Sequence, residues 1–207
     1  MALVKYNNNS LSSVTNAASF PAGAMTHIKT LTASSSSTLS FVDGSSDVVL
    51  DSTYPIYMFK FINIHPSGDG TLFAMNFSTD SGSNYNVTKT NTMFYARHGE
   101  DGSNALLYYD THRDMAQGTG DMVIFSTQGN GADESGSGSM FLFNPSSTTF
   151  VKHFMVESNV LEDNSYTYHT FVTGYGNTTS AIDGVKFDFN SGNIDSGTIK
   201  LYGIKDS

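Results

Sequence analysis

The densest group of side chains that could perform chemistry lies in one stretch, "RHGEDGSNALLYYDTHRD", at residues 97–114. Carboxylates, imidazoles and guanidinium groups in a long loop can bind a carbohydrate or a cation. The carboxylates lack the alternating oxygen ligands of an EF-hand loop, so we expect no metal. A solvated connection around a short strand, 105–109, is the alternative interpretation. The candidate ligand-binding residues are Arg97, His98, Glu100, Asp101, Asp110, His112, Arg113 and Asp114.

The remaining sequence contains no pattern of catalytic or metal-binding residues. Six histidines occur without HxH or HExxH spacing, and no Gly-x-Ser-x-Gly motif is present. The chain has no cysteine, which excludes disulfides, thiolate metal sites and a thiol nucleophile. No pair of carboxylates stands out for glycosidase chemistry. We therefore predict no catalytic residue and no cofactor, and we expect that the protein is not an enzyme.

Composition narrows the class of partner. Of 207 residues only 10 are Lys or Arg, and the net charge is −9, so the chain lacks the basic patch that a phosphate backbone requires. The N-terminus lacks the apolar core of a signal peptide, and no apolar run approaches the roughly 20 residues that span a bilayer. We expect a soluble protein without nucleic acid as a partner and without a membrane-inserted segment.

Short apolar and aromatic runs, separated by clusters of Gly, Ser, Asp and Asn, indicate an all-β fold. No stretch has helical periodicity. Many short strands with turns about every ten residues favour a two-sheet antiparallel sandwich of jelly-roll type over a closed barrel. The predicted strands are 27–33, 38–43, 47–51, 56–65, 71–79, 85–89, 92–97, 105–109, 121–127, 139–144, 149–157, 167–174, 183–189 and 198–204.

Three local patterns predict how particular strands are placed. The strand at 56–64 has apolar residues on both faces, which is typical of a central strand. The turn sequences "PSGDG" (66–70) and "NPSST" (144–148) each predict a hairpin between the strands that flank them. The last run, 198–204, alternates apolar and polar residues and predicts a final strand with one buried face that completes a sheet.

The first 26 residues differ from the rest of the chain. They are rich in Asn, Ser and Ala and contain few residues whose burial could offset the entropy of ordering. We divide the chain into an extended N-terminal arm, 1–26, and one β-sandwich domain, 27–207. A disordered tail is the alternative for the arm. Its candidate attachment residues are Lys5, Tyr6, Leu11, Val14 and Phe20.

Four stretches together carry a resemblance that covers nearly the whole chain. They are "MALVKYNNNSLSSVT", "YMFKFINIHPSGDGTLFAMNFSTDSGSNYNVTKTN", "FLFNPSSTTFVKHF" and "SGNIDSGTIKLYGI". They resemble small virion proteins of tailed bacteriophages, especially marine, cyanophage-like ones. The ending is the most specific part, because a closing strand of the form "SGTIKLYGI" recurs in tail-fibre and other surface-displayed β-domains. No residue in these stretches is a catalytic signature.

The resemblance implies a fold, an assembly and a function. Such proteins are similar in being jelly-roll-like, commonly homotrimeric, and attached to other virion proteins by an N-terminal segment while the β-domain faces outward. It implies a non-enzymatic virion protein, assembled in the host cytoplasm and located in a tail fibre or tail tip, that binds a host-surface glycan or protein. A capsid decoration (cement) protein of the head is the alternative, and a polysaccharide depolymerase is less favoured.

Overall fold

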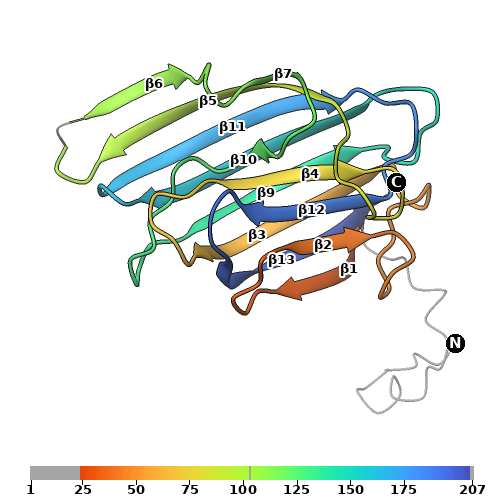
Figure 1. The fold of residues 1–207 in the computed structure, drawn as a ribbon, viewed down its shortest axis with the longest axis horizontal. Helices are drawn as coiled ribbons and strands as arrows, with labels where there is room; N and C mark the ends of the chain where they lie inside the picture. Colours follow the sequence, from red (N-terminus) through yellow and green to blue (C-terminus); the bar gives the residue numbers. More distant parts are fainter. Residues whose placement is uncertain (1–23, 103, 206–207) are drawn as a thin grey trace, which may run out of the picture.

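The predicted all-β class is confirmed. The computed structural model describes residues 24–102 and 104–205, and in this part of the chain it contains thirteen β-strands and no helix. The strands form two antiparallel sheets that lie face to face as a sandwich (Figure 1). Residues 1–23, which include all five candidate attachment residues of the arm, lie outside the described residues.

The two sheets differ in size. The larger sheet contains β1 (Met25–Thr32), β3 (Ile56–Pro66), β5 (Lys89–Gly99), β6 (Ala105–Tyr109), β7 (Met115–Gly118), β9 (Gly136–Phe143), β10 (Lys152–Glu162), β11 (Tyr166–Gly176) and β13 (Ile194–Ile204). The smaller sheet contains β2 (Leu39–Val42), β4 (Phe73–Ser78), β8 (Met122–Val123) and β12 (Gly184–Phe189).

The strand order shows how the chain passes between the sheets. The larger sheet has the order β1-β13-β3-β9-β10-β11-β5-β6, with β7 also paired to β5, and the smaller has the order β2-β12-β4-β8. From β1 to β5, and again from β11 to β13, each successive strand changes sheet. The apolar face of each strand can therefore pack against strands of the opposite sheet.

Aromatic rings fill the space between the sheets. Phe187 on β12 contacts Phe59 and Phe61 on β3, with ring centroids 5.4 and 5.2 Å apart. Phe61 also meets Phe73 of β4 at 5.8 Å. All four rings are at most 2% exposed. Edge-to-face aromatic contacts of this kind add to the area that the rings bury, so these phenylalanines hold the two sheets together.

One predicted hairpin is wrong and the other is confirmed. "NPSST" joins β9 to β10, which pair directly, with Phe154 opposite Leu142. "PSGDG" instead carries the chain from β3 in the larger sheet to β4 in the smaller one. The two flanking strands stack through Phe61 and Phe73 and share no ladder. A turn sequence reports that the chain reverses, but not whether the next strand pairs beside the first or packs on its face.

The strand boundaries show a second limit of the pattern. The predicted strand at 47–51 is wrong. Of the predicted strand at 85–89, only Lys89 lies in a strand, at the start of β5, and the predicted strand at 121–127 shrinks to β8. Val48, Leu50 and Val87 are nevertheless buried in the core. Apolar residues at these positions therefore record burial of loop side chains without ladder hydrogen bonds. The prediction also lacked β7, which has no apolar alternation.

The two strands with specific predicted positions lie inside the larger sheet. β3 is central, between β13 and β9, as predicted. β13 is longer than the predicted strand at 198–204, because Asp195 to Gly197 continue the strand through two register irregularities. Ile199 and Leu201 are fully buried, which confirms the predicted buried face. β13 does not end the sheet, however, because β1 pairs with its other side.

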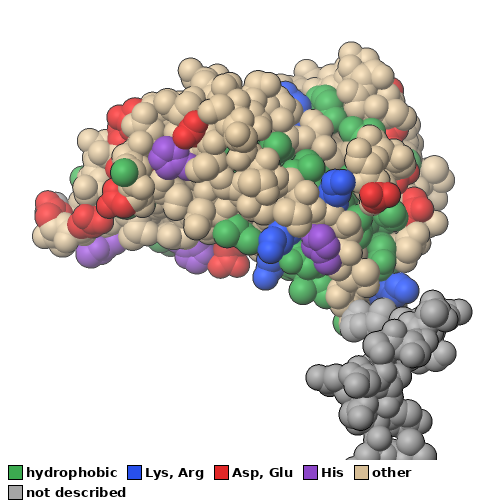
Figure 2. Space-filling view, turned by 90° about the horizontal axis from the view of Figure 1, so that it is seen from below, with side chains coloured by type: hydrophobic (Ala, Val, Ile, Leu, Met, Phe, Trp, Pro, Cys, Tyr) green, Lys and Arg blue, Asp and Glu red, His purple; other side chains and the backbone are tan. Residues whose placement is uncertain are grey.

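The face of the larger sheet turned away from the smaller sheet, here called the outer face, carries many apolar side chains. Met155 is 52% exposed, Phe94 39% and Leu107 73%. Phe141, Phe143 and Phe171 are half-buried on the same face. Figure 2 shows a neighbouring side of the molecule, the edge at β1, β2 and β13, where hydrophobic side chains also reach the surface beside Lys, Arg and His side chains. The outer face is more apolar than an ordinary solvated surface.

Candidate functional site

The eight candidate ligand-binding residues separate into two groups. Arg97 and His98 lie at the end of β5, with Glu100 and Asp101 in the turn to β6. Asp110, His112, Arg113 and Asp114 follow β6, at the opposite end of the same hairpin. The pairing of His98 with Ala105 and of Phe94 with Tyr109 fixes this separation. The length of a five-residue strand, about 17 Å, stands between the groups, so they do not form one site.

The group after β6 has a structural role. Arg113 forms an ion pair of 3.2 Å with Asp110, which is buried. The same guanidinium donates hydrogen bonds to Ser126 Oγ at 3.0 Å and Thr127 Oγ1 at 2.8 Å. These contacts fasten the loop after β6 to the segment that follows β8. With its donors used inside the protein, Arg113 has little capacity left for a ligand.

The group at the end of β5 is different, because its arginine faces aromatic rings. The guanidinium of Arg97 lies 5.1 Å from the ring centroid of Tyr166 and 6.0 Å from that of Tyr168. Its Nη1 donates a hydrogen bond of 3.0 Å to the hydroxyl of Tyr168, and this bond raises the pKa of Arg97. Its Nε is buried and has no hydrogen-bond partner among the described residues. A charged, incompletely bonded donor is therefore held between aromatic rings.

Two further tyrosines extend this arrangement. The ring of Tyr95 lies 4.9 Å from that of Tyr168 and 5.6 Å from that of Tyr108, which is 42% exposed. We call Arg97, Tyr95, Tyr108, Tyr166 and Tyr168 the arginine–tyrosine cluster. In Figure 1, β5 and β6 extend past the smaller sheet, so this end of the sandwich is not covered by β4 or β12. Sequence reasoning found Arg97 but could not group the tyrosines, because they come from three strands.

A hollow opens beside the cluster. It has a volume of about 270 Å³, and the carboxylates of Glu100 and Asp101 border it. The backbone amide of Glu100 donates to the carbonyl of Ser165 at 3.0 Å, which joins the two loops that form the hollow. The lining residues are Gly99, Glu100, Asp101, Asn164, Ser165 and Tyr166. Carboxylates, an amide and an aromatic ring in one hollow can accept hydrogen bonds from hydroxyl groups and stack against an apolar ring face.

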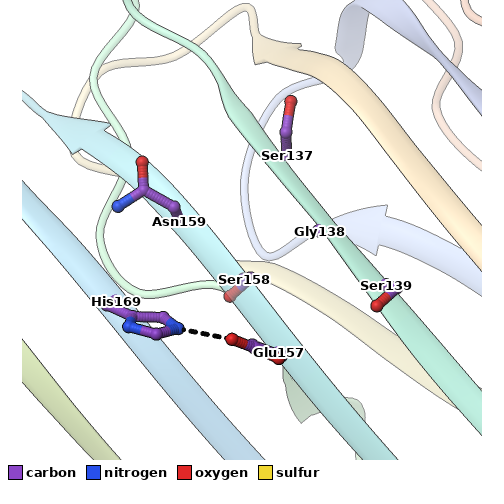
Figure 3. Close-up of a pocket in the computed structure, with 7 residues that line it drawn as sticks. All are labelled: Ser137, Gly138, Ser139, Glu157, Ser158, Asn159 and His169. Carbon is purple, nitrogen blue, oxygen red and sulfur yellow. Dashed lines mark hydrogen bonds and ion pairs between the residues drawn. The ribbon is translucent and has the colours of Figure 1, made fainter.

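A second hollow, on the outer face, holds a histidine and a carboxylate (Figure 3). His169 Nε2 lies 2.9 Å from Glu157 Oε1, and Ser139 stands opposite Glu157 in the ladder between β9 and β10. The carboxylate is thus between the serine and the imidazole, so the imidazole is not placed to take a proton from the serine. The two paired side chains are 45% and 61% exposed, and such a pair contributes about 1 kcal/mol or less.

Residues 24–102 and 104–205 contain no group of three or more His, Cys, Asp or Glu side chains that could hold a metal ion. The same residues contain no helix long and apolar enough to cross a membrane. Comparison of the chain with protein-family models, with curated proteins and with solved structures finds no match.

Proposed function

We propose that the protein is a non-enzymatic structural protein of a tailed-phage virion, displayed as part of a tail fibre or tail tip, that binds a glycan of the host surface. The observation that carries the binding role is the arginine–tyrosine cluster at the uncovered end of the sandwich. The virion assignment rests on the sequence resemblance. Passage of successive strands between the two sheets is compatible with a jelly-roll arrangement, which belongs to the same proposal.

The position of the cluster supports outward display. β1, which follows the N-terminal arm, and β6, which borders the cluster, are the first and last strands of the main path through the larger sheet. Seven strand spacings of about 4.8 Å put them roughly 34 Å apart. An arm that attaches to another virion protein at the β1 edge leaves the opposite edge directed away from the attachment point. The cluster at that edge is then free to meet the host.

The chemistry of the cluster favours a glycan. Tyr108 and Tyr166 offer ring faces against which the C–H face of a sugar can stack. Arg97 offers a charged donor to sugar oxygens or to a carboxylate. Glu100 and Asp101 at the adjoining hollow can accept hydrogen bonds from hydroxyl groups. The three kinds of contact complement one another, because a sugar has both an apolar face and a hydroxylated rim.

The location in the virion can be tested directly. Mass spectrometry and cryo-EM of intact particles should find the protein in a few copies at the tail. Its absence from the particle would refute the virion assignment. Many copies on the head would support a capsid decoration protein and would refute the tail assignment.

Host binding needs a separate experiment. The purified protein should bind host cells, and treatment of the cells with periodate, which oxidises sugars, should abolish binding while protease treatment should not. Arg97→Ala should weaken binding by about tenfold or more, the equivalent of one hydrogen bond to a charged group. Lys205→Ala is a matched control, because Lys205 also lies over a tyrosine ring, that of Tyr54 at 5.8 Å. Equal binding by both variants, with equal thermal stability, would refute the glycan site.

A further inference from the structure

The outer face of the larger sheet has an ordered pattern of charge and apolar side chains across its central strands. One row, read from β13 to β11, is Tyr202, Met58, Phe141, Met155 and Thr173, each directly paired with the next. Met155 is 52% exposed, although a methionine in a sheet normally packs against a neighbour. The smaller sheet, on the other face, does not cover this row. Met58 is nevertheless only 6% exposed, so Phe141, Met155 and Tyr202 form its exposed apolar surface.

The adjacent row carries the charges. Ser139 on β9 pairs with Lys60 on one side and with Glu157 on the other. Lys60 in turn pairs with Lys200 of β13. Like charges directly opposite each other destabilise a sheet, and neither lysine has an ion-pair partner among the described residues. The row is therefore Lys200, Lys60, Ser139 and Glu157. It carries positive charge on one side of β9 and negative charge on the other.

We propose that two copies of this chain, and not the three that the sequence resemblance implies, associate through their outer faces about a two-fold axis that runs along β9. Such an axis places each row of one copy over the same row of the second copy, with the strands on the two sides of β9 exchanged. Lys60 of one copy then stands opposite Glu157 of the second copy, and the same contact occurs twice. In the apolar row, Phe141 faces its own counterpart, and Met58 faces Met155. Sheets that pack face to face lie about 10 Å apart, a gap that Lys and Glu side chains can bridge.

Other placements of the axis give repulsive contacts. An axis along β3 puts Lys60 against Lys60, and an axis along β10 puts Glu157 against Glu157. An axis perpendicular to the strands and through Ser139 puts Lys60 against Lys60 and also Glu157 against Glu157. Among these placements only the axis along β9 pairs opposite charges while the apolar row stays in contact. The register of the sheet therefore selects one geometry.

The outer face is large enough for a stable dimer. Eight strands at a spacing of about 4.8 Å and a strand length of about 30 Å give a face of about 1,000 Å². A standard interface buries about 800 Å² per partner. A hollow of about 340 Å³ between the side chains of Phe141, Phe143, Met155 and Phe171 also lies on this face. Under the proposed axis it faces Tyr202 of the second copy, whose partly exposed ring can fill it.

Charge exchange tests the geometry. Sedimentation of the full chain should give twice the mass of one chain. Lys60→Glu and Glu157→Lys each create two like-charge contacts and should each raise the dissociation constant by about tenfold or more. The double variant, Lys60→Glu with Glu157→Lys, should restore association. Lys29→Glu, on β1 and off the charged row, is the control for net charge. A monomer, a trimer, or a dimer that both single variants leave unchanged would overturn the proposal.

The absence of cysteine allows a second measurement that does not depend on affinity. Ser139→Cys introduces a single thiol that faces its own counterpart across the axis. A bismaleimide with a reach of about 10 Å, the distance between stacked sheets, should link the two copies in high yield. Ser81→Cys places an exposed thiol in the loop after β4 and should give little linkage. Equal linkage of both variants would overturn the proposed face.

Discussion

A lysine buried inside the sandwich gives the sharpest test of the packing. Lys89 at the start of β5 is fully buried, and its ammonium donates to Asn76 Oδ1 at 2.6 Å and to the carbonyl of Val87 at 2.7 Å. The amide of Asn76 in turn donates to Asp121 Oδ1 at 2.9 Å. Burial lowers the pKa of Lys89 to about 8, while the charge of Asp121 opposes the shift. Asn76 is therefore the side chain that accepts a hydrogen bond from the buried ammonium of Lys89 in place of water.

The perturbation is Asn76→Leu, alone and combined with Lys89→Met. The single change removes the side-chain acceptor of a buried ammonium, and a lost hydrogen bond to a charged group costs about 1.5–3 kcal/mol. We expect a loss of about 3 kcal/mol at pH 7, because the carbonyl of Thr119 and the carboxylate of Asp121 also lose the hydrogen bonds that the Asn76 amide donates to them. Replacing Lys89 by methionine removes the charge that needed the acceptor. The double variant should therefore be about 2 kcal/mol more stable than Asn76→Leu alone.

The pH dependence follows from the same shift. The pKa of Lys89 lies near 8 in the folded state and near 10.5 in the unfolded state. Between these values the unfolded chain binds more protons, so this group makes the folded state more stable as the pH rises. A difference of about 2.5 pKa units corresponds to at most about 3 kcal/mol. The stability of the wild type relative to Lys89→Met should thus increase between pH 7 and pH 9.5.

Urea unfolding, followed by circular dichroism and tyrosine fluorescence at pH 7, 8 and 9.5, measures each free energy of unfolding. The comparison with Lys89→Met cancels the titration of other groups. Equal stability of Asn76→Leu and the double variant, or a wild-type difference that does not change with pH, would refute the account of a buried cation held by Asn76.

Three further changes test the fold. Removal of 201–207 takes Leu201 from the core and removes part of β13, the strand that lies between β1 and β3. We expect an insoluble protein, because backbone groups of both neighbouring strands lose their partners. A soluble, folded truncation would contradict this. Gly203→Ala places a Cβ against the ring of Tyr54 and should cost about 1–3 kcal/mol in urea unfolding, whereas an unchanged midpoint would show that the ring can move aside. Arg113→Ala breaks the ion pair with buried Asp110 and should lower stability by about 2 kcal/mol, with host binding unchanged.

The sequence could predict much of the fold because a strand shows itself as an alternation of side chains within a few consecutive residues. In β3 the aromatic residues recur at every second position, which identifies the strand and its buried face without any partner. The "NPSST" turn identifies its hairpin for the same reason, since both paired strands adjoin it. Val48 and Leu50 show where such a pattern misleads, because burial of a loop selects the same apolar residues as burial of a strand.

The candidate site was predictable only in part. The sequence placed Arg97 and Arg113 in one candidate group because they lie close together along the chain. The ladder between β5 and β6 separates them, and three-dimensional packing gives them different partners. Arg113 bonds to Asp110 and to the hydroxyls of Ser126 and Thr127. Arg97 lies over the rings of Tyr166 and Tyr168 of β11. The tyrosines lie about 70 residues from Arg97 in the sequence, so no local pattern could join them.

The sequence by itself determined the all-β class, the approximate places of most strands and the buried face of the last one, because these depend on side-chain alternation within a few residues. Only the tertiary structure decided that "PSGDG" connects two sheets, that β13 lies inside the larger sheet, and that Lys60 and Glu157 flank Ser139. Each of these depends on which distant strand becomes a neighbour. That choice is made by the packing of whole faces, such as Phe61 and Phe73 against Phe187, and local periodicity carries no record of it.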